Sequence, residues 1–181
     1  MAPLQQDRVG LAPHRIEHCQ VSTHDDLAAV HASGLGVSFF ANHLYYWGDR
    51  HRDLFLGPHR AADMDALSWA DRLGQRYGLH SDCPITPMDP LRTMWSATSR
   101  RTRDGHVLGA HQRITPLRAL QAMTVDSHWL VGDEDQVGTL RVGQRADLVA
   151  IDREVDTLGP DGLRDATVSA VMVEGEWMAA P

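Results

Sequence analysis

The chain has 181 residues, of which 43% are hydrophobic and 23% charged, so it holds enough apolar material to form a folded core. Its formal net charge of -7 argues against nucleic acid as a partner, because proteins that bind phosphates usually present a basic surface. All 17 basic residues are arginines. The sequence therefore supplies no lysine for a Schiff base, a P-loop or a carbamylated lysine that bridges two metals.

The cysteine content and the absence of long apolar runs suggest where the protein resides. Cys19 and Cys83 are too few for a disulfide framework, and we expect both to be small buried packing residues. Residues 1–8 lack the basic start and apolar run of a signal peptide, and no stretch is long enough to cross a bilayer. We therefore expect a cytoplasmic protein without a membrane partner.

The first half of the chain alternates between strand and helix patterns. Residues 1–13 are polar and without period, which predicts a disordered lead-in whose first methionine is an arbitrary start. A strand at 15–18 is followed by a helix that Thr23 caps, and then by an apolar strand at 37–40. This order predicts parallel strands with helices outside them.

The segment up to residue 81 adds a third unit of this kind. Residues 42–58 are predicted to form a long loop, residues 60–77 a helix and residues 77–81 a strand. The three units together occupy the region 14–126, which we expect to be α/β.

The second half changes from helical to β-rich patterns. Asp89 and Thr115 are each followed by proline, a typical helix start, which predicts a helix from 90 to about 103 and another from 116. A short helix at 125–131 precedes glycine turns and a hairpin at 174–175. We therefore place a domain boundary near residue 127, with a β-rich tail at 127–181.

Two strand ends carry potential metal ligands. Ile16 and His18 share one face of an extended strand, and so do His80 and Asp82. A neutral imidazole can bind Zn²⁺, and a carboxylate can bind it or hold its water. We therefore predict His18 and Asp82 as metal ligands. We also predict Asp82 as the catalytic group that accepts a proton from the metal-activated water and passes it to the leaving group.

The polar and aromatic residues near these strand ends suit a pocket for a small-molecule substrate. The predicted substrate contacts are Asn42, His43, Tyr45, Tyr46, Trp47 and His80. These side chains could instead form a packed lid, His18 could be structural, and Asp82 could cap a turn.

The remaining charged candidates show no ligand spacing. Arg100, Arg101 and Arg103 are interpreted as a solvated helix end. The other candidate histidines are interpreted as surface residues: His51, His59, His106, His111 and His128.

Four segments, taken in their order and spacing, resemble the amidohydrolase-3 family of metal-dependent hydrolases. Residues 15–18 resemble its sixth barrel strand with a metal ligand, and residues 42–47 resemble the loop after the seventh strand. Residues 79–82 resemble the eighth strand with its aspartate, and residues 138–149 resemble the return to the small β-domain. One departure is that Phe40 and Ala41 stand where similar sequences have Gln-Pro.

This resemblance implies a partial (β/α)8 TIM barrel, containing the last three strand–helix units, followed by part of a β-sandwich. It implies a hydrolase that cleaves carbon–nitrogen bonds other than peptide bonds in a small amide-type substrate, with Zn²⁺ as the divalent metal. The chain has no His-x-His pair, so the other ligands would lie in a preceding barrel segment, and the chain alone should be inactive.

Two other interpretations remain open. The chain could be a non-catalytic truncated module that binds a partner chain or self-associates, because an open half-barrel leaves a strand edge unpaired. It could also be a self-contained α/β binding domain with a β-tail.

Overall fold

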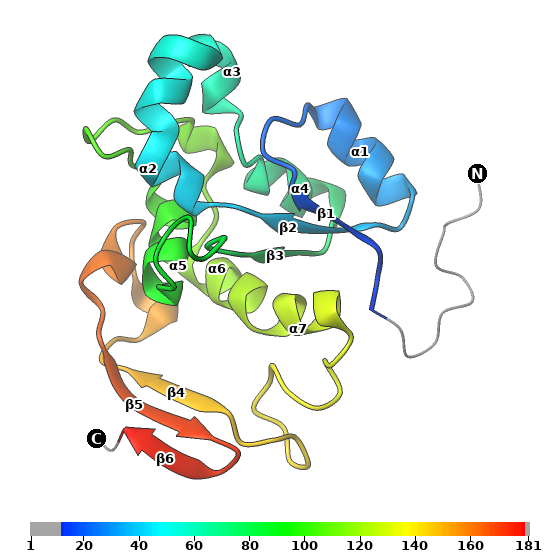
Figure 1. Ribbon diagram of the computed structural model, residues 1–181, viewed down its shortest axis with the longest axis vertical. Helices are drawn as coiled ribbons and strands as arrows, with labels where there is room; N and C mark the ends of the chain where they lie inside the picture. The colour runs from blue at the N-terminus through cyan, green and yellow to red at the C-terminus, as the bar shows by residue number, and fades with distance from the viewer. Residues whose placement is uncertain (1–11, 180–181) are drawn as a thin grey trace.

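The computed structural model describes residues 12–179 (Figure 1). Most of the predicted lead-in, residues 1–11, lies outside this part of the chain. The described residues form an α/β structure with two three-stranded sheets, one parallel and one antiparallel. Among the helices of this part, none has both the length and the apolar character that spanning a membrane requires.

The parallel sheet has the order β1-β2-β3, which confirms the predicted alternation of strands and helices. Its strands are β1 (Arg15–His18), β2 (Gly36–Phe39) and β3 (Tyr77–Leu79). His18 is paired with Phe39 in a parallel register. The carboxyl ends of all three strands therefore lie at one edge of the sheet.

The first crossover is the helix α1 (His24–Ala32), as predicted. Thr23 accepts a hydrogen bond from the backbone N–H of Asp26, and the Asp26 carboxylate accepts one from the backbone N–H of Thr23. This reciprocal cap satisfies N–H groups that have no partner within the helix. Leu27 is fully buried and fastens the helix to the core.

The predicted loop at 42–58 is wrong, because this segment is helical. It contains α2 (Asn42–Arg50), the π-helical turn η1 (His51–Phe55) and the start of α3 (Gly57–Ala62). Leu44 and Gly48, one turn apart on α2, are both buried. Burial of this narrow face against Leu108 stabilises a helix that the polar and aromatic composition did not suggest.

The helix predicted at 60–77 is divided in two. After α3, the chain turns at Asp65, whose φ is 45°, and then continues as α4 (Leu67–Leu73). The Asp65 backbone N–H donates to the Gln20 carbonyl over 2.9 Å. This turn therefore lies directly beside the segment that follows β1.

The helix α5 (Pro90–Ser99) begins at the predicted Asp89 cap but ends before residue 103. It stops at Arg100, which has a φ of 54° and is fully buried. Its guanidinium donates to the carbonyls of Met64 over 2.6 Å and Asp65 over 3.0 Å, and to that of Leu108 over 2.7 Å. The interpretation of Arg100 as part of a solvated helix end is therefore wrong.

The helices α6 (Pro116–Met123) and α7 (Val125–Val131) follow at the predicted places. A Cβ atom on Gly78 of β3 would lie 2.7 Å from the Ser127 hydroxyl of α7, so α7 packs closely against the parallel sheet. The predicted boundary at residue 127 falls within this helix. The division into two domains stays a prediction.

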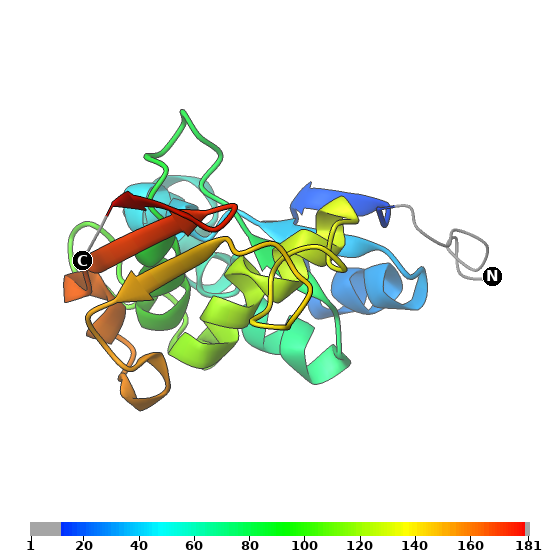
Figure 2. The same cartoon turned by 90° about the horizontal axis from the view of Figure 1, so that it is seen from below.

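The tail forms the antiparallel sheet of β4 (Leu148–Ile151), β5 (Val168–Val173) and β6 (Glu176–Ala179). The hairpin between β5 and β6 turns at Glu174 and Gly175, as predicted, and both have positive φ. Figure 2 shows this sheet beside α5, α6 and α7. The remaining short 3-10 helices are η2 (Ala110–Gln112), η3 (Val155–Thr157) and η4 (Gly162–Asp165).

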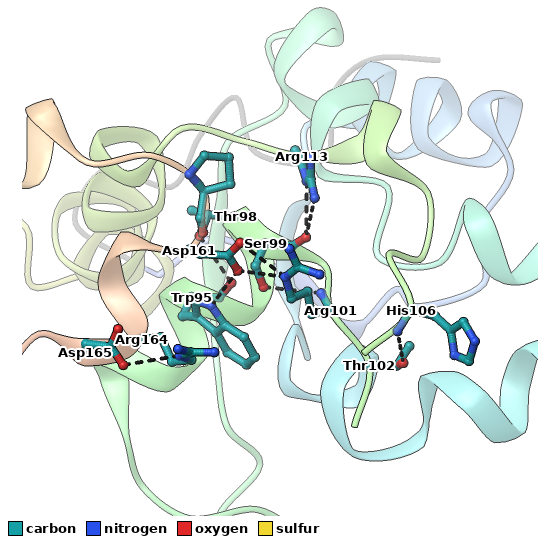
Figure 3. Close-up of polar contacts among 11 residues, drawn as sticks. Trp95, Thr98, Ser99, Arg101, Thr102, His106, Arg113, Asp161, Arg164 and Asp165 are labelled. Atoms are coloured by element: carbon teal, nitrogen blue, oxygen red, sulfur yellow. Dashed lines mark hydrogen bonds and ion pairs between the residues drawn. The ribbon is translucent and has the colours of Figure 1, made fainter. Parts of the chain in front are cut away.

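The connection between β4 and β5 fastens the tail to α5 (Figure 3). The Asp161 carboxylate accepts a hydrogen bond from Trp95 Nε1 over 3.3 Å and from Arg101 Nε over 3.0 Å. The Thr98 hydroxyl donates to the Pro160 carbonyl over 2.7 Å. Leu163, in the same connection, is fully buried in the main core, so apolar and polar contacts together hold the tail against the rest of the chain.

Replacing Asp161 by asparagine should cost less than about 1 kcal/mol, since the pair with Arg101 is largely exposed. The hydrogen bond from Arg101 lowers the pKa of Asp161 below 3.8. The contribution of the Asp161 carboxylate to the free energy of unfolding should therefore be present above pH 4 and be lost as the pH falls through the lowered pKa. The melting temperatures of the wild type and D161N at pH 7 and pH 3 test this pH dependence. D165N, which alters the more exposed pair with Arg164, should leave the melting temperature unchanged at both pH values. An equal decrease in melting temperature in D161N and D165N would contradict the role given to Asp161.

Candidate active site

Two of the predicted site residues meet at the carboxyl edge of the parallel sheet. His18 ends β1 and His80 follows β3, and their ring centroids lie 5.0 Å apart. Phe40 follows β2 between them, 5.5 Å from the His18 ring and 5.1 Å from the His80 ring. The parallel strand order thus brings together two imidazoles that are separated by about sixty residues in the sequence.

Asp82 lies in the turn after β3 rather than on the strand. The strand ends at Leu79, and Asp82 has a φ of 51°, so the predicted alternation of side chains from His80 to Asp82 does not continue. Asp82 is half-buried, and its negative charge acts to raise the pKa values of both His43 and His80. The carboxylate therefore lies near the imidazoles, although by a different backbone path from the one predicted.

The helix α2 adds His43 and Trp47 to this edge. They are one helical turn apart, and their ring centroids are separated by 4.6 Å. The Phe40 ring lies 5.0 Å from His43 and 6.2 Å from Trp47. Three of the six predicted substrate contacts, His43, Trp47 and His80, therefore pack on the Phe40 ring.

The two tyrosines of the same segment lie elsewhere. Tyr45 packs against Trp95 of α5 at 5.4 Å, and the Arg92 guanidinium lies 5.2 Å from its ring. Tyr46 contacts Tyr45 and lies 5.9 Å from the guanidinium of Arg103. The structure does not bring either tyrosine to the histidine pair.

Asn42 has a structural role beside the site. It is fully buried, and its side-chain amide donates to the Thr86 hydroxyl over 2.9 Å. The Thr86 hydroxyl in turn donates to the Ser81 carbonyl. Asn42 therefore links the start of α2 to the turn that carries Asp82, a structural contact that the sequence did not indicate.

His51 also belongs to this cluster, so its interpretation as a surface residue is wrong. Its Nε2 lies 3.1 Å from His43 Nδ1, and the Gln20 amide nitrogen also contacts that atom. His51 is half-buried, and burial lowers its pKa. The sequence feature that could have identified His51 is its spacing of eight residues from His43. In a helix this spacing is about two turns and places both side chains on one face, whereas in a loop it predicts no contact.

The imidazoles of His43, His51 and His80 favour their neutral forms. Burial, followed by the charges of His51 and His18, lowers the pKa of His43 from 6.5 to about 4. Burial and the charge of His18 also lower the pKa of His80. A neutral imidazole is the form that binds a metal ion or accepts a proton.

The low pKa of His43 predicts that acid destabilises the protein. Between pH 6.5 and about 4 the unfolded chain binds a proton at this residue that the folded chain does not, so stability should fall as the pH falls through this window. Urea denaturation at pH 7.5 and pH 5 measures this loss. The decrease in the free energy of unfolding between pH 7.5 and pH 5 should be smaller in H43F than in the wild type. It should be as large as in the wild type in H59F, which replaces an exposed histidine. An unchanged loss in H43F would contradict the assignment.

The donor atoms of the site fit a bound group but do not complete a metal centre. His80 Nε2 is buried and has no hydrogen-bond partner in the described part of the chain, as expected of an atom that faces a ligand. Within residues 12–179, no three His, Cys, Asp or Glu side chains are arranged to hold a metal ion. His18, His80 and Asp82 therefore supply only part of a ligand set.

Comparison with known proteins identifies the family. The sequence matches the profile of the amidohydrolase family over residues 3–179. It is 30% identical over 128 residues to the N-substituted formamide deformylase of Arthrobacter pascens, a match that covers 71% of this chain and 22% of the deformylase.

Solved structures show the same fold. An uncharacterized metal-dependent hydrolase from Pyrococcus horikoshii superposes with a TM-score of 0.68 at 20% identity, covering 82% of this chain and 30% of that one. An adenosine deaminase from Xanthomonas campestris with bound Zn superposes with a TM-score of 0.63 at 16% identity, covering 92% of this chain and 37% of that one. The chain spans less than half of each of these proteins, and it belongs to the amidohydrolase family.

Proposed function

We propose that this chain is the C-terminal part of a metal-dependent hydrolase that cleaves the carbon–nitrogen bond of a small amide. The observation that carries the proposal is the convergence of His18 and His80 at 5.0 Å on the carboxyl edge of the parallel sheet, beside His43 and Asp82. In barrel enzymes this edge of the sheet is where catalytic residues gather.

The same arrangement supports the barrel assignment. Three parallel strands with crossover helices would be the last three units of a (β/α)8 barrel, and the antiparallel tail would be part of its β-sandwich. The segment that supplies the other strands would also supply the missing ligands.

A divalent metal, Zn²⁺ in our proposal, fits the donors that this chain offers. His18 would bind it through an imidazole nitrogen and Asp82 through a carboxylate oxygen, and both are ligand types that Zn²⁺ takes. The metal would lower the pKa of water and polarise the substrate carbonyl. His80, with its unpartnered Nε2, would face the substrate or a ligand of the metal.

Asp82 would move the proton during the reaction. As the water oxygen bonds to the carbonyl carbon, Asp82 accepts the proton that the water loses. When the carbon–nitrogen bond breaks, the same proton goes to the leaving nitrogen, which departs as an amine. The carbonyl carbon leaves as a carboxylic acid.

The substrate class follows from the deformylase relative. N-substituted formamides are small amides, and the aromatic side chains of Phe40 and Trp47 beside the histidines offer an apolar surface for the nitrogen substituent. We therefore propose N-substituted formamides as the first substrates to test.

The experiment joins this chain to a segment that covers the part of the deformylase it does not span. The assembled protein should bind a divalent metal and hydrolyse N-butylformamide, and the chain alone should do neither. A folded, metal-bound assembly that hydrolyses no amide would refute the proposed function.

A second candidate, a non-catalytic module that binds a partner chain, is favoured by one observation. Within residues 12–179, β1 is one of the two edge strands of the parallel sheet, and an unpaired edge can accept a strand from another chain. Size-exclusion chromatography of the chain distinguishes this case, since a stable monomer with one cooperative melting transition would argue against it.

A further inference from the structure

Two side-chain nitrogen atoms from separate segments of the chain approach the same atom of His43. One is the amide nitrogen of Gln20, two residues after the end of β1, and the other is Nε2 of His51 at the start of η1. Both contact His43 Nδ1, the second over 3.1 Å. The ring is also held in place by Phe40 and Trp47, at 5.0 and 4.6 Å.

The contact with the Gln20 side-chain nitrogen indicates which His43 nitrogen carries the proton. A carboxamide nitrogen has two hydrogens and no acceptor site, so it can only donate. His43 Nδ1 must therefore accept, which requires that it carries no proton.

The His51 contact supports the same conclusion independently. His51 Nδ1 is buried and has no partner among residues 12–179. If His51 Nε2 accepted a hydrogen bond, the proton of a neutral His51 would be on the buried Nδ1, leaving an unsatisfied donor, which is rare in folded proteins. If His51 Nε2 donates instead, His51 Nδ1 carries no proton. His51 is therefore better placed as a second donor to His43 Nδ1.

We propose that Gln20 and His51 are positioning residues that hold His43 as the Nε2–H tautomer, so that the site presents a neutral hydrogen-bond donor to the carbonyl oxygen of an amide. The identity of this acceptor rests on the proposed function, whereas the tautomer does not. The carbonyl oxygen gains negative charge as water attacks the carbon, so a donor fixed in advance stabilises the transition state more than the bound substrate. The opposite tautomer would present a bare nitrogen and repel the oxygen.

The first test measures the tautomer in the full 181-residue chain. Nitrogen-15 NMR of labelled histidines at pH 7.5, with His43 assigned by the signals that H43F lacks, separates protonated from unprotonated ring nitrogens. His43 should show a bare Nδ1 and a protonated Nε2. A protonated Nδ1, alone or together with Nε2, would overturn the proposal.

The matched variant is Gln20→Glu, because a carboxylate only accepts hydrogen bonds at this pH. In Q20E, His43 should move its proton to Nδ1 or gain a second one there. Q121E, the same exchange on the exposed face of α6, should leave the His43 signals unchanged. An unchanged His43 tautomer in folded Q20E would contradict the role given to Gln20.

The second test measures catalysis in the assembled protein with N-butylformamide. Q20E should lower kcat by about 10²–10³-fold, the usual effect of losing one oxyanion donor, with metal content unchanged and KM changed much less. Activity in the wild type together with an undiminished kcat in Q20E would overturn the donor role. If the wild-type assembly were inactive but the tautomer were as expected, the proposed function would fail while the His43 assignment stood.

Discussion

Replacing Asp82 by asparagine should lower kcat of the assembled hydrolase by about 10²–10⁴-fold, the range expected when a general acid–base is removed. Asparagine has nearly the same shape but cannot accept the proton that the attacking water loses. Rates with N-butylformamide over a range of concentrations, together with metal analysis of each preparation, measure the effect.

The matched control is D89N, which makes the same exchange at the cap of α5. Asp89 accepts a hydrogen bond from the Arg92 backbone N–H over 2.9 Å, and asparagine caps helices about as well. D89N should therefore keep wild-type activity. If D82N were as active as D89N, Asp82 would have no part in the proton transfer.

The largest effect on folding is expected from Arg100→Met. This change removes the donor to the backbone carbonyls of Met64, Asp65 and Leu108 from a fully buried position. It also leaves the fully buried carboxyl of Asp65 without the neighbouring positive charge that opposes its raised pKa. The loss should be about 3–5 kcal/mol, because three buried carbonyl groups lose their charged hydrogen-bond donor at once.

Urea denaturation of two further variants makes this prediction specific. R101M alters the adjacent arginine, whose side chain is 40% exposed, and should lower the stability far less than R100M does. The double variant R100M/D65N should be more stable than R100M, because it no longer buries an uncompensated acidic group. Equal stability of R100M and R101M would show that the buried contacts contribute little.

Local patterns predicted most of the secondary structure. The strand–helix–strand order, the caps at Thr23, Asp89 and Thr115, and the hairpin at 174–175 are set by residues close together in the sequence. Such features depend on side-chain period, capping atoms and turn chemistry, all of which can be read without the fold.

Features that depend on tertiary packing were not predictable in this way. The helix α2 is polar and aromatic, and burial of Leu44 and Gly48 against Leu108 explains why it is helical. The burial of Arg100 needs the carbonyls of a turn that lies thirty-five residues earlier in the sequence. No local sequence pattern indicates which residues pack against α2 or which carbonyl groups bind Arg100.

The candidate site was predictable in part. His18, His43, Trp47 and His80 were singled out and lie together, whereas Tyr45 and Tyr46 pack elsewhere. His51 was missed because its spacing from His43 has meaning only once residues 42–55 are known to be helical. The catalytic, metal-binding and substrate-binding roles of these residues stay predictions.

The central claim is that one cation is bound jointly by the imidazole that ends β1 and the carboxylate that follows β3. A crystal structure of the assembled protein grown with Zn²⁺ tests this claim most directly. The account predicts that His18 and Asp82 bind the same ion. A fully occupied metal site that includes neither residue, or side chains of His18 and Asp82 that point to separate places, would contradict it.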